Sequence, residues 1–259
     1  MTARLALVTG ATGYVGGQLV PVLLDHGWRV RVLSRSRDKL DRLAWADRIV
    51  NGTAQPGEVE VVIGNADQQH DVAAALSGVE VAWYLLHSMG ESDNLLEQEH
   101  RLASLFGSQA RRAGVGRIVY LGGLHPEGEL SEHLRSRVEV GRVLMGSGVP
   151  TAALQAGVVI GDGSISFRML RHLSERLPGA LAPRWITNRI QPIAIADLLH
   201  YLVAVADLPP EVNRTFDIGG ADVVRYCDMM KQYAAVVGLG PRVVATAPVT
   251  TPNPAAHWI

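Results

Sequence analysis

Three glycines near the N-terminus have the spacing of a turn that binds an anion. Gly10, Gly13 and Gly16 follow an apolar run over residues 5–9 and open a segment of helical periodicity over residues 14–26. Glycines at these places permit a tight turn, let backbone amides approach a pyrophosphate and let the helix pack closely on the strand. The helix N-terminus adds amide groups that point at the anion. Strand, turn and helix together predict a dinucleotide site, whose expected contacts are Gly10, Thr12, Gly13, Tyr14, Val15 and Gly16.

The end of the second predicted strand, over residues 28–33, indicates which dinucleotide binds. Sites for NAD carry an acidic residue about 20 positions after the turn, where it holds the ribose hydroxyls. Here the sequence is Leu33-Ser34-Arg35-Ser36-Arg37 and contains no carboxylate. Arg35 and the two serines can form charge-assisted hydrogen bonds with a 2′-phosphate, so we expect NADP(H) to be preferred over NAD(H). In the alternative interpretation, Arg35 and Arg37 are solvated loop charges.

The elements that must position these residues alternate between strand and helix along the chain. Further strands are predicted over 59–63, 79–86, 117–121, 151–160 and 215–218, and further helices over 72–76, 94–113, 134–145, 167–177, 194–206 and 226–237. This alternation predicts an α/β fold with a doubly wound parallel sheet (Rossmann), whose ligand crevice lies at the carboxyl ends of the strands. We expect one NAD(P)-binding domain over 1–245, with a small C-terminal lobe on the substrate side drawn mainly from 157–190 and 210–245. Residues 246–259 are expected to form a tail or the start of a truncated further region.

The chain resembles the atypical members of the short-chain dehydrogenase/reductase superfamily that carry a Thr-Gly-x-x-Gly-x-x-Gly turn, in particular the extended and NmrA-like proteins and the group of the complex I nucleotide-binding accessory subunit. Gly64-Asn65-Ala66 is similar to the step that touches adenine, with Asn65 in place of the usual Asp, and residues 191–197 and 216–220 are similar to two later family segments. The resemblance implies further cofactor contacts at the ends of the third, fourth and fifth strands. These are Asn65, Ala66, Leu85, Leu86, His87, Leu121 and Gly122.

The chain departs from this family at the catalytic positions. Redox-active members carry a Ser after the fifth strand and a Tyr-x-x-x-Lys pair on the next helix, whereas this chain has no Ser there and places His133 and Arg137 where Tyr and Lys would be. A His with a pKa near ~6.5 can exchange a proton at physiological pH, so His133 is a candidate general acid. Arg137 can hold ribose hydroxyls but stays protonated and cannot relay a proton. Alternatively, the site has lost its proton donor and His133 is a surface residue at a loop-to-helix junction.

The resemblance places the segment after the sixth strand near the nicotinamide, where the substrate pocket begins. The expected lining is Val158, Phe167 and Met169, together with His125, which follows an apolar strand and is therefore expected near the crevice. Such a pocket suits a hydrophobic or quinone-like compound better than a sugar nucleotide, although the same residues are equally typical of an ordinary core.

These features predict an NADPH-dependent reductase of a small apolar carbonyl, enone or quinone-like compound. The missing Ser-Tyr-Lys set favours an alternative, in which a non-catalytic protein binds NADP(H) as a redox sensor or as an assembly or regulatory subunit. An isomerase or epimerase that uses its bound cofactor catalytically is a third and weaker interpretation.

Composition excludes several other classes of partner. Lys and Arg number 24 against 25 Asp and Glu, so no global field favours nucleic acid. No apolar run reaches the ~18 residues of a membrane span, and the nine histidines show no metal-ligand spacing, so no metal is expected. The single Cys227 fits a reducing compartment, and we expect the protein in the cytoplasm, although a secreted protein without disulfides would show the same cysteine count. The resemblance also makes a homodimer possible.

Overall fold

The computed structural model describes residues 3–87, 95–125, 128, 130–176, 179–182 and 184–246, without the side chains of 179–182, 184–185 and 243–246. The chain forms two compact units, each with its own hydrophobic core. The first comprises Met1–Gln155 and Ala196–Ile218, and the second comprises Ala156–Ile195 and Gly219–Ile259. The second unit overlaps both ranges expected on the substrate side, and the assignment of these ranges to a substrate lobe of one domain stays a prediction.

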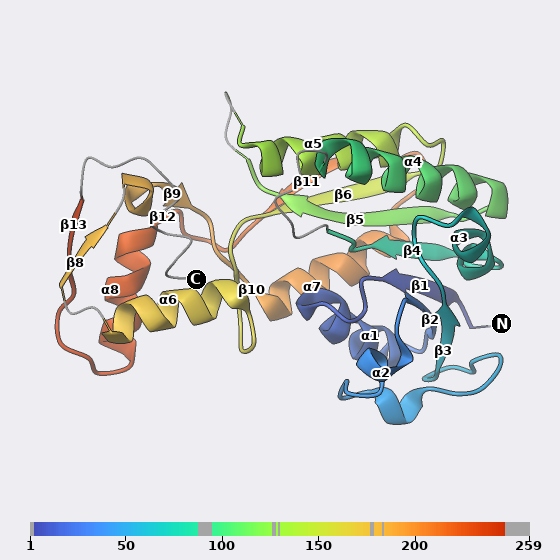
Figure 1. The fold of residues 1–259 in the computed structure, drawn as a ribbon, viewed down its shortest axis with the longest axis horizontal. Coiled ribbons are helices and arrows are strands. Elements are labelled where there is room, and N and C mark those ends of the chain that lie inside the picture. The colour runs from blue at the N-terminus through green and yellow to red at the C-terminus, as the bar shows by residue number, and fades with distance from the viewer. Residues whose placement is uncertain are drawn as a thin grey trace. The chain divides into compact units, whose positions relative to one another are not determined.

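The first unit is built on a seven-stranded sheet in the order β11-β6-β5-β4-β1-β2-β3 (Figure 1). Strand β1 pairs in parallel with β2 and β4, β2 pairs in parallel with β3, and β4 with β5. Strands β2 and β3 lie on one side of β1, and β4 lies on the other side, so the strand order reverses at β1. Ligands of such folds bind at the carboxyl ends of the strands at this reversal. The predicted doubly wound α/β fold is confirmed. The strands are β1 Leu5–Thr9, β2 Arg29–Ser34, β3 Val59–Ile63, β4 Val81–Tyr84, β5 Arg117–Gly123, β6 Thr151–Ala156 and β11 Arg214–Ile218.

Helices cover both faces of this sheet. In Figure 1, α3, α4 and α5 lie along one face, and α1 and α7 lie along the other. The core under the first group contains Tyr84 and Phe106, whose ring centroids are 4.9 Å apart. On the other face, the indole nitrogen of Trp83 donates a hydrogen bond of 2.9 Å to the carbonyl oxygen of Leu202, which joins β4 to α7. The helices are α1 Tyr14–Asp25, α2 Arg37–Leu40, α3 Gln69–Leu76, α4 Leu95–Ala113, α5 Glu132–Met145 and α7 Ile195–Ala204, with 3-10 helices over Ala46–Arg48 and Val205–Asp207.

The described residues of the second unit form two helices, a 3-10 helix and three short strand pairs. Its core combines Leu170, Ile186, Met229 and Met230 with the ring of Tyr226. Strand β7 pairs in parallel with β10, β8 in parallel with β13, and β9 antiparallel with β12. The elements are α6 Ile165–Arg176, α8 Tyr226–Val236, the 3-10 helix Arg184–Thr187, β7 Val159–Ile160, β8 Gly179–Ala182, β9 Arg189–Ile190, β10 Ile193–Ala194, β12 Val224–Arg225 and β13 Val243–Thr246.

The strand predicted over 151–160 was wrong in its length. It is interrupted between β6 and β7, because a Cβ atom at Gly157 would lie 2.4 Å from the carbonyl oxygen of Gln191 and the chain turns there in close backbone contact. Several other boundaries also shift by a few residues. Strand β5 continues to Gly123, and α5 begins at Glu132, so His133 lies in the first turn of that helix.

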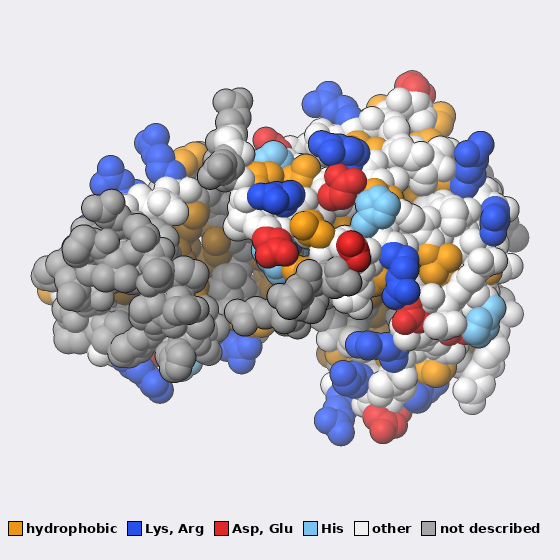
Figure 2. Space-filling view, turned by 45° about the horizontal axis from the view of Figure 1, so that its top comes forward, with side chains coloured by type: hydrophobic (Ala, Val, Ile, Leu, Met, Phe, Trp, Pro, Cys, Tyr) orange, Lys and Arg blue, Asp and Glu red, His pale blue; other side chains and the backbone are white. Residues whose placement is uncertain are grey.

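The face drawn in Figure 2 carries charges of both signs. Among the described residues drawn there, basic, acidic and histidine side chains are interspersed, in keeping with a formal net charge of −1. Within the described residues, no helix combines the length and apolar character that crossing a bilayer requires.

Candidate cofactor site

The glycine turn after β1 is kept tight by close backbone contacts. Gly10 has a φ of +72°, and a Cβ atom there would lie 2.5 Å from the carbonyl oxygen of Leu85. The amide of Gly13 donates a hydrogen bond of 2.9 Å to the carbonyl oxygen of Gly10. A Cβ atom at Gly16 would lie 2.3 Å from that same oxygen. Side chains at positions 10 and 16 would therefore force the turn away from β4 and α1.

Helix α1 begins at this turn in a way that suits an anion. Its N-cap is Gly13, which has no side chain to cap the first turn, so the amide groups there are left for an external acceptor. The hydroxyl of Tyr14 is buried, and no described residue gives it a hydrogen-bond partner. Buried hydroxyls normally have a partner. The glycine cradle and this hydroxyl therefore both fit a bound polar group at the start of α1.

A pocket of about 530 Å³ lies against the glycine turn. Its walls come from the turn itself, the loop after β2, helix α2, the loops after β3 and β4, and the first half of α4. Eight predicted cofactor contacts line it: Gly10, Thr12, Ser34, Arg35, Asn65, Ala66, Leu86 and His87. The other predicted contacts, which are not in its lining, are Gly13, Tyr14, Val15, Gly16, Leu85, Leu121 and Gly122. The remaining lining residues are Leu33, Ser36, Lys39, Gly64, Asp67, Tyr84, Leu95, Gln98, Glu99 and Leu102.

The loop after β2 brings Arg35 into this pocket. The hydroxyl of Ser34 donates to the carbonyl oxygen of Ser36 at 3.1 Å and accepts from the amide of Ser36 at 3.3 Å. Ser34 therefore shapes the turn on which Arg35 sits, so its hydroxyl is not free in the way the sequence prediction assumed. No described residue pairs a carboxylate with Arg35.

A second cation, Lys39, lines the same pocket, and the sequence analysis did not identify it. Lys39 lies in α2, which is a single turn of helix. Arg37 in the same helix forms an exposed ion pair of 2.8 Å with Asp41 and does not line the pocket. The described parts of the chain offer Lys39 no ion-pair partner. The sequence offers no specific signal for Lys39, because α2 begins at Arg37 and the four positions between Arg35 and Lys39 are therefore not a helical spacing.

The loop after β3 is fixed from helix α3. A Cβ atom at Gly64 would lie 2.5 Å from Cγ of Asp71, and the Oδ2 atom of Asp71 accepts a hydrogen bond of 2.7 Å from the amide of Asn65. Asp71 thus holds the backbone at the position where the resemblance places adenine. Its role was also not foreseen from sequence.

His87 lies at the β4–β5 end of the pocket. Its ring centroid is 6.2 Å from that of Tyr120. The pKa of His87 is lowered to about 4, chiefly by burial and also by the positive charges of Arg137 and His133, while a hydrogen bond to the backbone of Leu121 acts to raise it. The imidazole is therefore neutral at physiological pH. The fold brings together His87, His133, Arg137 and Leu121, which the sequence named separately.

Helix α5 presents the two residues that replace the family's Tyr and Lys. Its N-cap is Ser131, whose hydroxyl accepts from the amide of Leu134 at 3.4 Å, and the exposed His133 lies in the first turn. Arg137 lies four positions later on the same face. A Cβ atom at Gly123 would lie 3.1 Å from Cδ2 of Leu134 and 3.4 Å from Cδ of Arg137, so the first turns of α5 pack closely against the end of β5.

Glu99 in α4 is a third residue that the sequence analysis missed. It lines the pocket, is buried, and accepts a short hydrogen bond from the hydroxyl of Ser136 in α5. The sequence does contain a clue to this role. Glu99 is a charged residue that falls between Leu95 and Leu102 on the apolar face of the helix.

The four predicted substrate-pocket residues belong to different units. His125 is in the first unit, where its Nε2 lies 3.4 Å from Nε2 of Gln155. Val158, Phe167 and Met169 are half-buried in the second unit, and the latter two pack against its core. Their shared role in binding a substrate stays a prediction.

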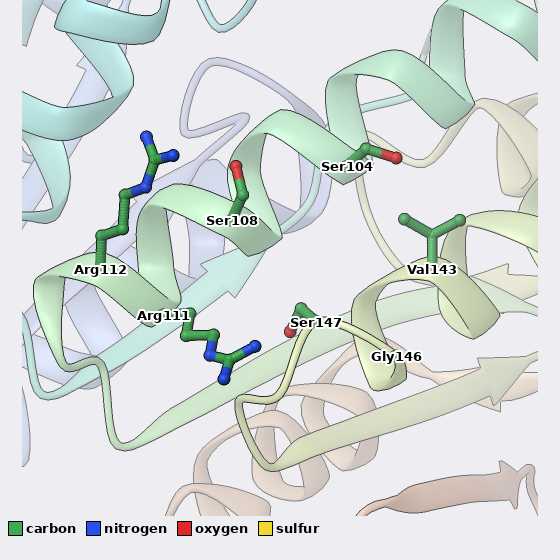
Figure 3. A pocket seen from close by; sticks show the side chains of 7 residues that line it. All are labelled: Ser104, Ser108, Arg111, Arg112, Val143, Gly146 and Ser147. Carbon is green, nitrogen blue, oxygen red and sulfur yellow. The ribbon is translucent and has the colours of Figure 1, made fainter.

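A separate hollow of about 620 Å³ lies between α4 and the C-terminal turn of α5 (Figure 3). Arg111 reaches across it towards Ser147, while Arg112, Ser104 and Ser108 project from other points along α4. None of its lining residues belongs to a predicted site. Across the described ranges, no group of three His, Cys, Asp or Glu residues is arranged to hold a metal ion.

Comparison with known proteins gives one family. A model of the NmrA-like family matches residues 2–160. The chain is 28% identical to the ceramide reductase of Caulobacter vibrioides over 246 residues, which is 92% of this chain and 72% of that protein.

Several solved structures share the fold. Citrobacter sp. triphenylmethane reductase complexed with NADP(H) has a TM-score of 0.69 at 22% identity, over 95% of this chain and 79% of that one. The Bordetella bronchiseptica enzyme WbmG in complex with NAD has a TM-score of 0.75 at 15% identity, over 99% of this chain and 88% of that one. At these identities, the likeness shows the fold alone.

Proposed function

The chain belongs to the NmrA-like family, and from that premise we propose that it binds NADP(H) and uses it to reduce a small apolar carbonyl or quinone-like compound. The observation that carries the proposal is a single pocket in which the glycine turn meets Arg35 and Lys39. The turn supplies backbone amides that can donate hydrogen bonds to a pyrophosphate. The two cations supply charge-assisted hydrogen bonds for a 2′-phosphate.

The preference for NADP(H) rests on local charge. The fold accepts either cofactor, because the related structures hold NADP(H) in one case and NAD in another. No acidic residue occupies the end of β2 to hold ribose hydroxyls, whereas Arg35 and Lys39 bring two positive charges to the pocket. These charges attract a 2′-phosphate, and they interact much more weakly with a ribose that carries no phosphate.

The residues near α5 would serve the reaction itself. When bound, the reduced nicotinamide supplies a hydride. Arg137 would hold the hydroxyls of the nicotinamide ribose, and the exposed His133 or water would give the proton. His87 is neutral at physiological pH and can take part in hydrogen bonds, but its low pKa makes it a poor proton carrier there.

An apolar substrate is supported by the relatives and by the second unit. The Caulobacter relative is named for ceramide and the Citrobacter enzyme for triphenylmethane dyes, and both kinds of compound carry large hydrocarbon parts. The expected lining of Val158, Phe167, Met169 and His125 offers few fixed charges. Such a lining favours an apolar ligand with few polar anchors.

Cofactor binding is tested by titrating the purified protein with NADPH and NADH and following fluorescence. We expect tighter binding of NADPH, and we expect R35A to lose most of the difference, on the order of tenfold or more. Equal affinities of the wild-type protein for the two cofactors would refute the preference.

Turnover is tested by following NADPH absorbance over a panel of ketones, enones and quinones. We expect oxidation of NADPH with at least one apolar member, and we expect H133F to slow it by about a hundredfold, the usual contribution of a general acid. Full activity of H133F would remove His133 from the mechanism.

The second candidate function is a non-catalytic NADP(H)-binding sensor, assembly or regulatory protein. It is favoured by the glycine at the end of β5 and by the lack of a Tyr-x-x-x-Lys pair on α5. Tight NADPH binding without oxidation by any member of the panel would support this candidate over the reductase. The cytoplasmic location and a homodimer stay predictions.

A further inference from the structure

A carboxylate is buried in the wall of the cofactor pocket. Glu99 lines the pocket yet is 6% exposed, and its partner Ser136 is 2% exposed. Acidic residues are rarely buried to this extent, because the carboxylate loses its hydration. A leucine at this position would complete the apolar face of α4. Packing alone therefore does not explain why the residue is a glutamate.

The charge of Glu99 lies on the β4–β5 side of the sheet. Burial raises the pKa of Tyr84 in β4, and the negative charge of Glu99 raises it further. Burial also raises the pKa of Tyr120 in β5. The positive charge of Arg137 acts to lower this pKa, and the negative charge of Glu99 acts to raise it. The hydrogen bond from Ser136 ties the carboxylate to α5 on the same side.

The phosphate-binding cations lie on the opposite side of the glycine turn. Arg35 follows β2, and Lys39 lies in α2, while the turn follows β1, which stands between β2 and β4 in the sheet. A dinucleotide bound at a strand reversal puts its pyrophosphate on the turn and its two nucleosides over the two halves of the sheet. With the adenosine at Arg35, the nicotinamide nucleoside lies on the side of Glu99.

We propose that the charge of Glu99 sets the balance between the two oxidation states of the bound cofactor, by favouring NADP⁺ over NADPH. This inference rests on the proposed function. The nicotinamide ring carries one positive charge when oxidised and none when reduced, so a buried negative charge attracts the oxidised ring only. The attraction is stronger than in water, because the pocket wall has a lower dielectric constant.

Other charges near the same end of the pocket act in the opposite direction. Arg137, and His133 when protonated, repel a positive ring, whereas neutral His87 has no such effect. The informative quantity is therefore the change in the affinity ratio when Glu99 loses its charge. A protein that retains oxidised cofactor in this way suits either a reductase slowed by product or a sensor of the NADP⁺ to NADPH ratio.

The test compares dissociation constants for NADP⁺ and NADPH, measured by isothermal titration calorimetry. The substitution E99Q keeps an acceptor for the Ser136 hydroxyl and removes the charge. We expect the ratio Kd(NADPH)/Kd(NADP⁺) to fall about tenfold in E99Q. The matched control is E97Q, which neutralises an exposed residue of the same helix and should leave the ratio within about twofold. E99D, which keeps the charge, should keep most of the ratio.

Two further variants separate charge from structure. S136A removes the hydrogen bond and leaves the carboxylate, so we expect lower stability with a nearly unchanged ratio. A fall of the ratio in S136A equal to that in E99Q would refute the electrostatic role. Where E99Q does not fold, E99M combined with S136A removes the carboxylate and the hydroxyl of this hydrogen bond together and gives a second protein without the carboxylate.

The possible failures are distinguishable. An unchanged ratio in a carboxylate-free variant that still binds both forms overturns this inference and leaves the proposed function standing. Failure of the wild-type protein to bind either form overturns the proposed function instead.

Discussion

The indole nitrogen of Trp45 donates a hydrogen bond of 2.9 Å to the carbonyl oxygen of Gly17. In a regular helix this oxygen would accept from the amide four positions later, but that position is Pro21, which lies inside α1 and has no N–H. Trp45 is 3% exposed, so the carbonyl is satisfied from a buried side chain outside the helix. This bond explains how α1, the helix that starts at the glycine turn, tolerates an internal proline.

A double-mutant cycle tests this replacement. W45F leaves the Gly17 carbonyl without its donor, and we expect the free energy of unfolding to fall by about 1–3 kcal/mol in urea titrations. P21A restores the helical N–H, so W45F should be less destabilising in the P21A background, by about 1 kcal/mol. If the two effects simply add, the carbonyl does not depend on Trp45.

His87 should make stability depend on pH. Its folded pKa is about 4, below the ~6.5 of an unfolded histidine, so between these values the unfolded chain binds more protons. The free energy of unfolding therefore falls as pH decreases from about 6.5 to about 4, by about 2–3 kcal/mol in total from this residue.

Urea titrations at several pH values measure this contribution as the difference between the wild-type protein and H87Q. We expect the difference in unfolding free energy to shrink steadily below about pH 6.5. H200Q, which replaces an exposed histidine, should leave the pH dependence as it is. A difference that stays constant from pH 7 to pH 5 would mean that His87 is not held neutral by the fold.

Local patterns were enough to predict the sheet and the glycine turn. The spacing of Gly10, Gly13 and Gly16 between a strand and a helix is a short-range signal, and so is the i, i+4 spacing that sets His133 and Arg137 on one face of α5. The predicted α/β fold followed from the alternation of elements. The physical reason is that these features depend on neighbours within one or two turns of the chain.

Residues whose role comes from distant contacts were missed. Glu99 acquires its place through Ser136, which lies 37 positions away in another helix. The break in the strand predicted over 151–160 arises where Gly157 meets the backbone of Gln191. Such contacts form only when the fold brings separate elements together. The periodicity of residues along the chain therefore cannot predict them.

The glycine turn gives a sharply matched pair of variants. In G16A the new Cβ atom would lie 2.3 Å from the carbonyl oxygen of Gly10, so we expect the turn to be displaced and NADPH affinity to fall on the order of a hundredfold. In G17A the nearest atom to the new Cβ is the carbonyl oxygen of Ala11 at 3.4 Å, an ordinary contact.

G17A should therefore keep the affinity and raise the free energy of unfolding by up to about 1 kcal/mol, because alanine favours the helix. Fluorescence titration and urea unfolding of both variants check these expectations. Equal loss of affinity in the two would show that helix α1, and not the turn, is what the substitution disturbs.

Lys39 and Arg37 lie two positions apart in α2 and give a similar comparison for the 2′-phosphate. Lys39 lines the pocket, whereas Arg37 is paired with Asp41 at 2.8 Å and is absent from the lining. Since an exposed cation facing a phosphate contributes through charge, we expect K39A to weaken NADPH binding about fivefold to tenfold and to leave NADH binding nearly unchanged.

R37A removes the same unit of charge from the same short helix and should change NADPH affinity by less than about twofold. The loss in K39A should also diminish between low and high salt, because the attraction between Lys39 and the phosphate is screened. Titrations of both variants with NADPH and NADH at two salt concentrations decide the matter. Equal losses in K39A and R37A would mean that the net charge around α2 attracts the phosphate and that the position of Lys39 in the pocket has no special part.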